Sequence, residues 1–158
     1  MRINVIPPEL LSDVHLRAEY REILMAQHYY KTSTNSKSGI IRSKISPVYT
    51  LNTGHAYLWY DKMLFIKERH DLLEIEMKNR NFKTREKYSL DLSCVLESDM
   101  NSYKCTKEDL IINLERVLER TLSKEGKNFY KYKGVNYNYN EWEQHFKSGI
   151  KRLLNIDL

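Results

Sequence analysis

The chain has 158 residues with a formal net charge of +5, 41% hydrophobic residues, and only 5 Gly and 3 Pro. This length suits one domain, and the composition is typical of a globular, helix-rich protein and excludes disordered and fibrous classes. No apolar run approaches the roughly 18 residues of a membrane span, and no secretion signal is recognisable, so we expect a cytoplasmic protein with no membrane partner. Cys94 and Cys105 lack zinc-finger spacing, and we interpret them as reduced and structural.

The first expected element is an arm. Pro7 and Pro8 favour extended backbone, which predicts that residues 1–6 precede the first helix as an arm. Ser12 or Asp13 can cap a helix that runs to about residues 31–34, where a polar segment ends it. Residues 44–60 are interpreted as a loop that leads into an aromatic-rich stretch.

Three further helices are predicted, which gives an all-α, single compact domain of three to four helices. Residues 61–78 repeat apolar side chains at helical spacing. Thr106, with Asp109 three residues later, is typical of a capping signal for a helix that ends near Gly126. Asn140 can cap a last helix, whose apolar side would hold Trp142, Phe146, Ile150 and Leu153.

Glu22 is a candidate functional residue of the first helix. Helical spacing places it beside Ala18 and Met25, with His15 on nearly the same side and Arg21 nearby. A carboxylate in such a stripe is partly desolvated, which would suit a catalytic role. Spacing alone nevertheless favours an ordinary salt bridge on the helix surface.

The positive net charge favours an anionic partner, of which nucleic acid is the commonest. Arg116, Arg120 and Lys124 recur every four residues, so they project from one helix face and could contact successive phosphates. Glutamates interleave with them, however, and without other evidence the spacing favours a solvated, locally paired face.

The segment from Phe129 to Gly134 alternates aromatic and basic residues, among them Tyr130 and Lys131. Such a strip could grip a nucleic-acid backbone and stack on exposed bases. An amphipathic edge strand would give the same pattern, and both interpretations stay open at this point.

Metal and nucleotide sites are not indicated. The five histidines include no pair at HExxH spacing, the acidic residues form no calcium loop, and no Gly-rich phosphate loop is present. We therefore expect a protein without metal or organic cofactor.

Three blocks of the sequence together carry a family resemblance. The first is Arg2-Ile3-Asn4 followed by His15-Leu16-Arg17-Ala18-Glu19-Tyr20-Arg21-Glu22. The second runs from Lys44-Ile45-Ser46-Pro47 through Gly54-His55 to Tyr60-Asp61-Lys62, and the third is Phe129-Tyr130-Lys131-Tyr132-Lys133-Gly134. They resemble the pyrimidine-dimer DNA glycosylases of the phage endonuclease V type, firmly over about residues 1–82, more thinly to 135 and not beyond.

The resemblance implies an all-helical fold whose N-terminal arm passes between helices and brings the terminal amine beside Glu22. In that family the amine attacks C1′ of the 5′ nucleotide of a cyclobutane dimer, forms an imine and cuts the strand by β-elimination. Glu22 would stabilise positive charge at C1′ and assist proton transfers. The residues that match positions facing DNA or the active centre are Arg2, His15, Arg21, Arg116 and Arg120.

The N-terminus departs from the family, which carries a threonine between the initiator methionine and Arg-Ile-Asn. Because initiator methionine is generally removed only before a small residue, we expect Arg2 to keep Met1 in place. The Met1 amine then occupies the register of the family's threonine amine. An α-amine titrates near 7.7–8.0 and lysine near 10.4, so the terminus has roughly a few hundred times more free base at neutral pH.

The expected function is therefore a glycosylase/AP lyase that acts on lesion-containing double-stranded DNA as a monomer. Met25 replaces an arginine of the family, and Phe129 replaces a tryptophan that is associated with lesion recognition in the family. Two alternative functions therefore stay open. The same fold could act on abasic sites or other damaged bases, or the chain could be a noncatalytic DNA-binding protein. Residues 136–158 extend beyond the family pattern as an additional C-terminal helix.

Overall fold

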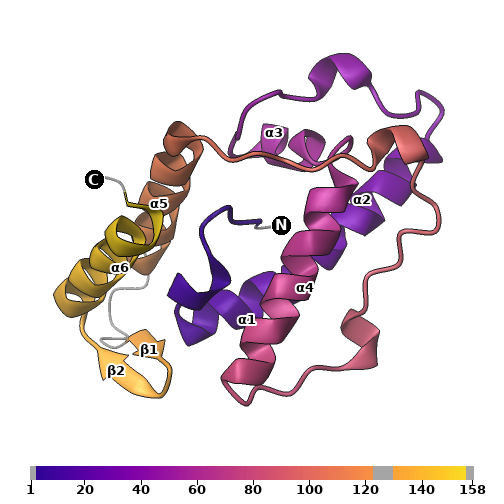
Figure 1. Cartoon of the computed structure of the whole chain (residues 1–158). Helices are drawn as coiled ribbons and strands as arrows, with labels where there is room; N and C mark the ends of the chain where they lie inside the picture. The colour runs from indigo at the N-terminus through magenta and orange to yellow at the C-terminus, as the bar shows by residue number, and fades with distance from the viewer. Residues whose placement is uncertain (1–2, 123–129, 156–158) are drawn as a thin grey trace. The chain divides into compact units, whose positions relative to one another are not determined.

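The computed structural model describes residues 3–122 and 130–155 of the chain and falls into two compact units. The units are Met1–Ile3 with Glu19–Cys105 (unit 1) and Asn4–Ala18 with Thr106–Leu158 (unit 2). Within the described ranges the protein is mostly helical, as expected, and its strands form one two-stranded sheet (Figure 1). The prediction of a single domain stays a prediction.

The expected continuous first helix is wrong in one respect, because it is divided at Ile23. The helix α1 spans Asp13–Glu22 and α2 spans Leu24–Thr34. Ile23 keeps helical torsions, with φ −61° and ψ −29°, but the Ala26 N–H donates to the Ile23 carbonyl only three residues back, at 3.0 Å. This tightened turn ends α1 directly after Glu22, and the Ile23 side chain is completely buried.

Unit 1 also contains α4 (Met63–Asn79), which confirms the helix predicted over residues 61–78. Its apolar residues at helical spacing are buried: Met63, Ile66, Leu73 and Met77. The interpretation of residues 44–60 as a loop is wrong in part, since α3 occupies Thr53–Leu58. The other short helices of this unit are the 3₁₀ turns Arg42–Lys44, Glu86–Tyr88 and Glu97–Asp99.

In unit 2, the 3₁₀ turn Pro8–Leu10 precedes α1, and α5 spans Lys107–Leu122. The capping signal predicted for α5 is confirmed. The Thr106 N–H donates to Asp109 Oδ2 at 2.8 Å, and the Asp109 N–H donates to Thr106 Oγ1 at 3.2 Å. The expected end of this helix near Gly126 lies outside the described residues.

The last helix, α6, spans Tyr139–Leu154 and packs beside α5 within unit 2 (Figure 1). Asn138 caps it, not Asn140, because Asn138 and Glu141 exchange side-chain and backbone hydrogen bonds in a capping box. The predicted apolar side is confirmed for Trp142, Phe146 and Ile150, which are fully buried. The Leu153 side chain lies outside the described part of the structure.

A hairpin precedes α6, formed by β1 (Tyr130–Tyr132) and β2 (Val135–Tyr137). Lys133 and Gly134 both have positive φ, at 48° and 85°, as a two-residue turn of this hand requires. The hairpin shows that the alternating segment forms a strand, and it departs from the all-α expectation. Its aromatic side chains pack toward α6, where the Tyr130 ring stacks on Trp142 with centroids 6.0 Å apart.

Candidate active site and nucleic-acid interface

Glu22, the predicted catalytic carboxylate, is the last residue of α1 and is half-buried. Ala18 and Met25, its predicted neighbours, are also half-buried, and Arg21 is exposed. The half-burial of these three side chains agrees with the partial desolvation that helical spacing predicts for Glu22. Met1 and Arg2 lie outside the described residues, so the position of the terminal amine stays a prediction.

The last turn of α1 is fixed against α4 by a salt bridge that spacing could not indicate. Arg69 Nε and Nη2 each donate to one oxygen of the Glu19 carboxylate, at 2.9 Å and 2.9 Å, and both side chains are buried. Next to this pair, the Tyr20 ring stacks on His70 with centroids 5.5 Å apart. The Glu19 carboxylate, three residues before Glu22, is thus bound in a buried salt bridge to Arg69.

The arm is held at Ile3 by two side chains of unit 1. The Ile3 N–H donates to His55 Nε2 at 3.1 Å, and the Ile3 carbonyl accepts from the Tyr49 hydroxyl at 3.0 Å. The Ile3 side chain is itself buried. Both backbone groups of a residue two positions from the terminus therefore have side-chain partners. Sequence reasoning missed these partners, although Gly54-His55 belongs to the second family block.

The hydrogen bonds of His55 define its tautomer. Nδ1 lies 2.8 Å from the Thr50 carbonyl, which can only accept, so Nδ1 carries the proton. Nε2 faces the Ile3 N–H and, at 3.4 Å, the Trp59 indole N–H, so it must be the acceptor. His55 is therefore neutral in this arrangement, and its ring lies edge-on to those of Tyr49 and Trp59.

The following arm residues are held within unit 2 by Asn113 of α5, which is fully buried. Asn113 Oδ1 accepts from the Val5 N–H at 2.8 Å and from the Ile6 N–H at 3.2 Å. Asn113 Nδ2 donates to Asn4 Oδ1 at 2.8 Å. One carboxamide thus satisfies three polar groups of the arm, which carries no helix or strand at these residues.

The remaining predicted DNA contacts of unit 2 differ in exposure. Arg116 and Arg120 are half-exposed on α5, and Lys131 is exposed on β1. Tyr130 is buried, and its ring lies 6.2 Å from that of His15, which is buried as well. The structure thus gives Tyr130 and His15 a packing role, and their contact with DNA stays a prediction. Lys124 and Phe129 lie outside the described residues.

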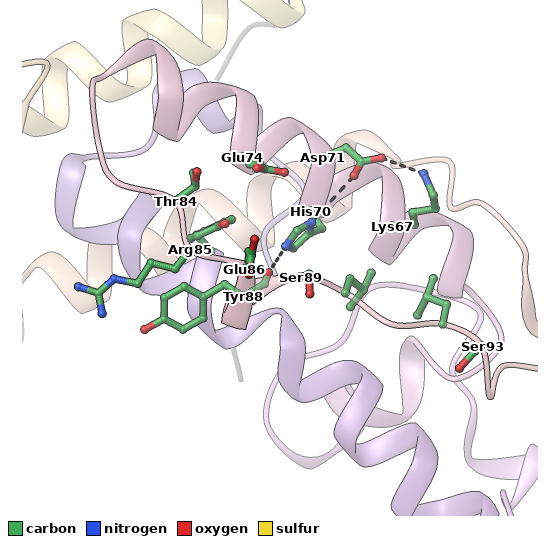
Figure 2. A pocket seen from close by; sticks show the side chains of 13 residues that line it. Lys67, His70, Asp71, Glu74, Thr84, Arg85, Glu86, Tyr88, Ser89 and Ser93 are labelled. Carbon is green, nitrogen blue, oxygen red and sulfur yellow. Dashed lines mark hydrogen bonds and ion pairs between the residues drawn. The ribbon is translucent and has the colours of Figure 1, made fainter.

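A pocket of about 650 Å³ in unit 1 contains none of the predicted site residues. It lies between α4 and the segment 84–93, and Figure 2 shows His70 at its wall between Asp71 and the Tyr88 carbonyl. His70 Nε2 is 2.7 Å from that carbonyl. Burial, reinforced by the charge of Glu74, raises the pKa of the pocket-lining Tyr20, so its phenol stays protonated at neutral pH. The pocket is lined by both acidic and basic side chains, which points to no one class of ligand.

Two features are absent from residues 3–122 and 130–155. No group of three or more His, Cys, Asp or Glu side chains in these ranges is arranged to hold a metal ion. No helix in the same ranges is long and apolar enough to cross a membrane.

The comparison with protein families matches residues 1–90 to the model described as pyrimidine dimer DNA glycosylase. The matched segment contains the whole arm, Glu22, the salt bridge between Glu19 and Arg69, and the His55 and Tyr49 side chains that hold Ile3. It covers more than half of the chain. The chain therefore belongs to the pyrimidine dimer DNA glycosylase family.

Proposed function

We propose that this protein is a monomeric, single-domain DNA-repair glycosylase and AP lyase that acts on cyclobutane pyrimidine dimers in double-stranded DNA. The observation that carries the proposal is the family match over residues 1–90, which includes both proposed catalytic groups, the Met1 amine and Glu22. The anchored backbone of Ile3 supports it, because a terminal nucleophile needs a fixed support.

In the proposed reaction, the lone pair of the unprotonated Met1 amine forms a bond to C1′ while the bond from C1′ to the base breaks. The electron pair of that bond leaves with the base, which takes up a proton. The sugar ring then opens to an imine, and loss of a C2′ proton expels the 3′ phosphate. The Glu22 carboxylate stabilises the positive charge that develops at C1′ and assists these proton transfers.

The proposed phosphate contacts are made by positively charged side chains. Arg2, Arg21, Arg116, Arg120, Lys124 and Lys131 would bind phosphates, and such contacts set the register without reading sequence. His15, Phe129 and Tyr130 would lie nearer the lesion. Extrusion of a nucleotide from the stack would give the amine access to C1′.

The deciding experiment is borohydride trapping on two duplexes, one with a cyclobutane dimer and one with an abasic site. Covalent adducts on both, mapped to the terminal Met1 peptide, are the expected result. An adduct on the abasic duplex alone would select a lyase for abasic sites or for another damaged base, which the replacement of a family arginine by Met25 makes worth testing. No adduct on either duplex, with DNA affinity retained, would show a noncatalytic DNA-binding protein.

A further inference from the structure

The side chains of His55 and Tyr49 clamp the backbone of Ile3 by two hydrogen bonds. We propose that they are positioning residues for the terminal amine, a role that rests on the proposed function. The clamp acts on the backbone, through the Ile3 N–H to His55 Nε2 at 3.1 Å and the Tyr49 hydroxyl to the Ile3 carbonyl at 3.0 Å. It therefore places the chain that carries the amine, whatever side chain the first residue has.

The clamp is preorganised by its surroundings. The Thr50 carbonyl keeps the proton on His55 Nδ1, which leaves the Nε2 lone pair directed to the arm. The Tyr49, His55 and Trp59 rings pack edge to face, with centroids 5.4 to 6.3 Å apart, and Trp59 is fully buried. Asn52, which precedes α3, has φ 60° and ψ −136°, a conformation that costs free energy in a residue with a side chain. The ring packing and the hydrogen bond to the Thr50 carbonyl together hold His55 in one orientation.

Removal of the clamp takes away backbone support that is close in sequence to the amine. With Ile3 fixed, two residues separate the anchor from the terminus, and each spans at most about 3.6 Å. Loss of the two Ile3 bonds would remove the support that lies nearest to the terminus among the described residues. Because a misplacement of about 1 Å can cost about 100-fold in rate, the effect should appear in the chemical step.

The test compares single-turnover imine formation on an abasic duplex, by borohydride trapping, with the affinity for the same duplex. His55→Phe keeps a planar ring but removes the acceptor, whereas His55→Gln retains an acceptor oxygen at similar reach. Tyr49→Phe removes only the hydroxyl that binds Ile3. Tyr57→Phe is the matched control. Tyr57 lies on the same helix as His55, and the substitution retains the aromatic ring, which faces Lys44.

We expect His55→Phe to slow imine formation by about 10- to 100-fold with unchanged DNA affinity, and His55→Gln to recover most of the rate. Tyr49→Phe should slow it to a smaller extent, and Tyr57→Phe should have no effect. Amide hydrogen exchange at Ile3 should accelerate in the His55→Phe and Tyr49→Phe proteins but not in the control.

The outcomes separate the two proposals. If the wild-type protein traps no abasic DNA, the proposed function is wrong and the positioning role falls with it. If the wild type traps and His55→Phe and Tyr49→Phe trap at the same rate, only the positioning role is overturned. Should His55→Phe fail to fold, Tyr49→Phe and His55→Gln still decide the question, since each retains most of the packing. Equal losses in His55→Gln and His55→Phe would also contradict the role of the acceptor.

Discussion

Arg69 of α4 and Glu19 of α1 form a buried bidentate salt bridge, in which the two side chains are 4% and 1% exposed. The pair joins segments 50 residues apart in the sequence. It fixes the last turn of α1, whose final residue is Glu22. The helix turn that carries the proposed catalytic carboxylate is thus anchored by a buried ion pair.

Arg69→Met should lower the free energy of unfolding by about 3–5 kcal/mol, because it removes the buried cation that pairs with the Glu19 carboxylate. The double variant Glu19→Leu/Arg69→Met should recover much of the loss, since no buried charge remains. Urea denaturation followed by circular dichroism measures both values. A double variant no more stable than Arg69→Met alone would contradict this account.

Glu22→Gln should lower the turnover of dimer-containing DNA by about 100- to 10,000-fold, because the amide keeps the shape but loses the charge and the capacity for proton transfer. Binding to the damaged duplex should remain close to that of the wild type. Gel-shift and strand-cleavage assays measure the two quantities. Glu97→Gln, at an exposed glutamate of unit 1, is the control and should leave both unchanged. Near-normal turnover of Glu22→Gln would assign the carboxylate role elsewhere.

Arg116→Ala and Arg120→Ala should each weaken binding to any duplex. If each arginine neutralises one phosphate, the slope of log affinity against log salt should become shallower by about one unit. Fluorescence anisotropy at several salt concentrations gives this slope. Lys78→Ala, which removes an exposed cation of α4 paired with Glu74, is the control and should leave the slope unchanged. An unchanged slope in the arginine variants would show that this face of α5 is only solvated.

Asp99 should contribute to the acid sensitivity of the fold. Burial disfavours its ionisation, but hydrogen bonds from Arg42 and the Tyr30 hydroxyl outweigh burial and hold the pKa of Asp99 below its ordinary value. A carboxyl with a lowered pKa stabilises the folded state above the unfolded pKa, near 3.9, and loses this contribution as pH falls through the folded pKa.

Asp99→Asn should therefore lower stability at neutral pH by about 2–3 kcal/mol and make the remaining stability less dependent on pH below about 4. Denaturation midpoints measured from pH 7 down to pH 3 test both parts. Tyr30→Phe, which removes one of the hydrogen bonds to Asp99, should also make stability less dependent on pH, but to a smaller extent. If the stability of Asp99→Asn and of the wild type fell equally with pH, Asp99 would not be a cause of acid unfolding.

The N-terminus should tolerate no change of register. One added residue displaces the amine by up to about 3.6 Å and should abolish most lyase activity. A threonine inserted between Met1 and Arg2 should instead permit methionine removal, restore the register and preserve activity. Intact mass establishes which residue is first in each protein, and borohydride trapping measures the activity. Full activity with an acetylated or extended terminus would overturn the mechanism.

Apolar periodicity was sufficient to predict the long helices. It placed α4 within two residues of its observed start, and Thr106 with Asp109 marked the beginning of α5 correctly. It missed α3, because six residues make too few turns for an apolar stripe to show. The division at Ile23 was also missed, since its torsions stay helical and only the hydrogen-bond partner changes.

The candidate site was predictable only where local spacing carries information. The half-burial of Glu22 agrees with that of the residues one turn away in sequence, Ala18 of α1 and Met25 of α2. The partners of Ile3 and Glu19 do not, because they lie about 50 residues away in sequence. The alternation of aromatic and basic residues at 130–132 does correspond to a strand. Its tyrosines pack toward α6, whereas Lys131 is exposed.

Unit 2 is built from both ends of the chain, and this has a consequence for synthesis on the ribosome. Glu9 and Asp13 accept hydrogen bonds from the Tyr132 hydroxyl and the Lys133 N–H, and Asn113 binds residues 4–6. A nascent chain that ends near residue 90 already contains the family-matched segment but lacks Asn113, Tyr132 and Lys133. Residues 4–6 therefore obtain their hydrogen bonds to Asn113 only after α5 has been synthesised, so unit 2 cannot form around them before that point.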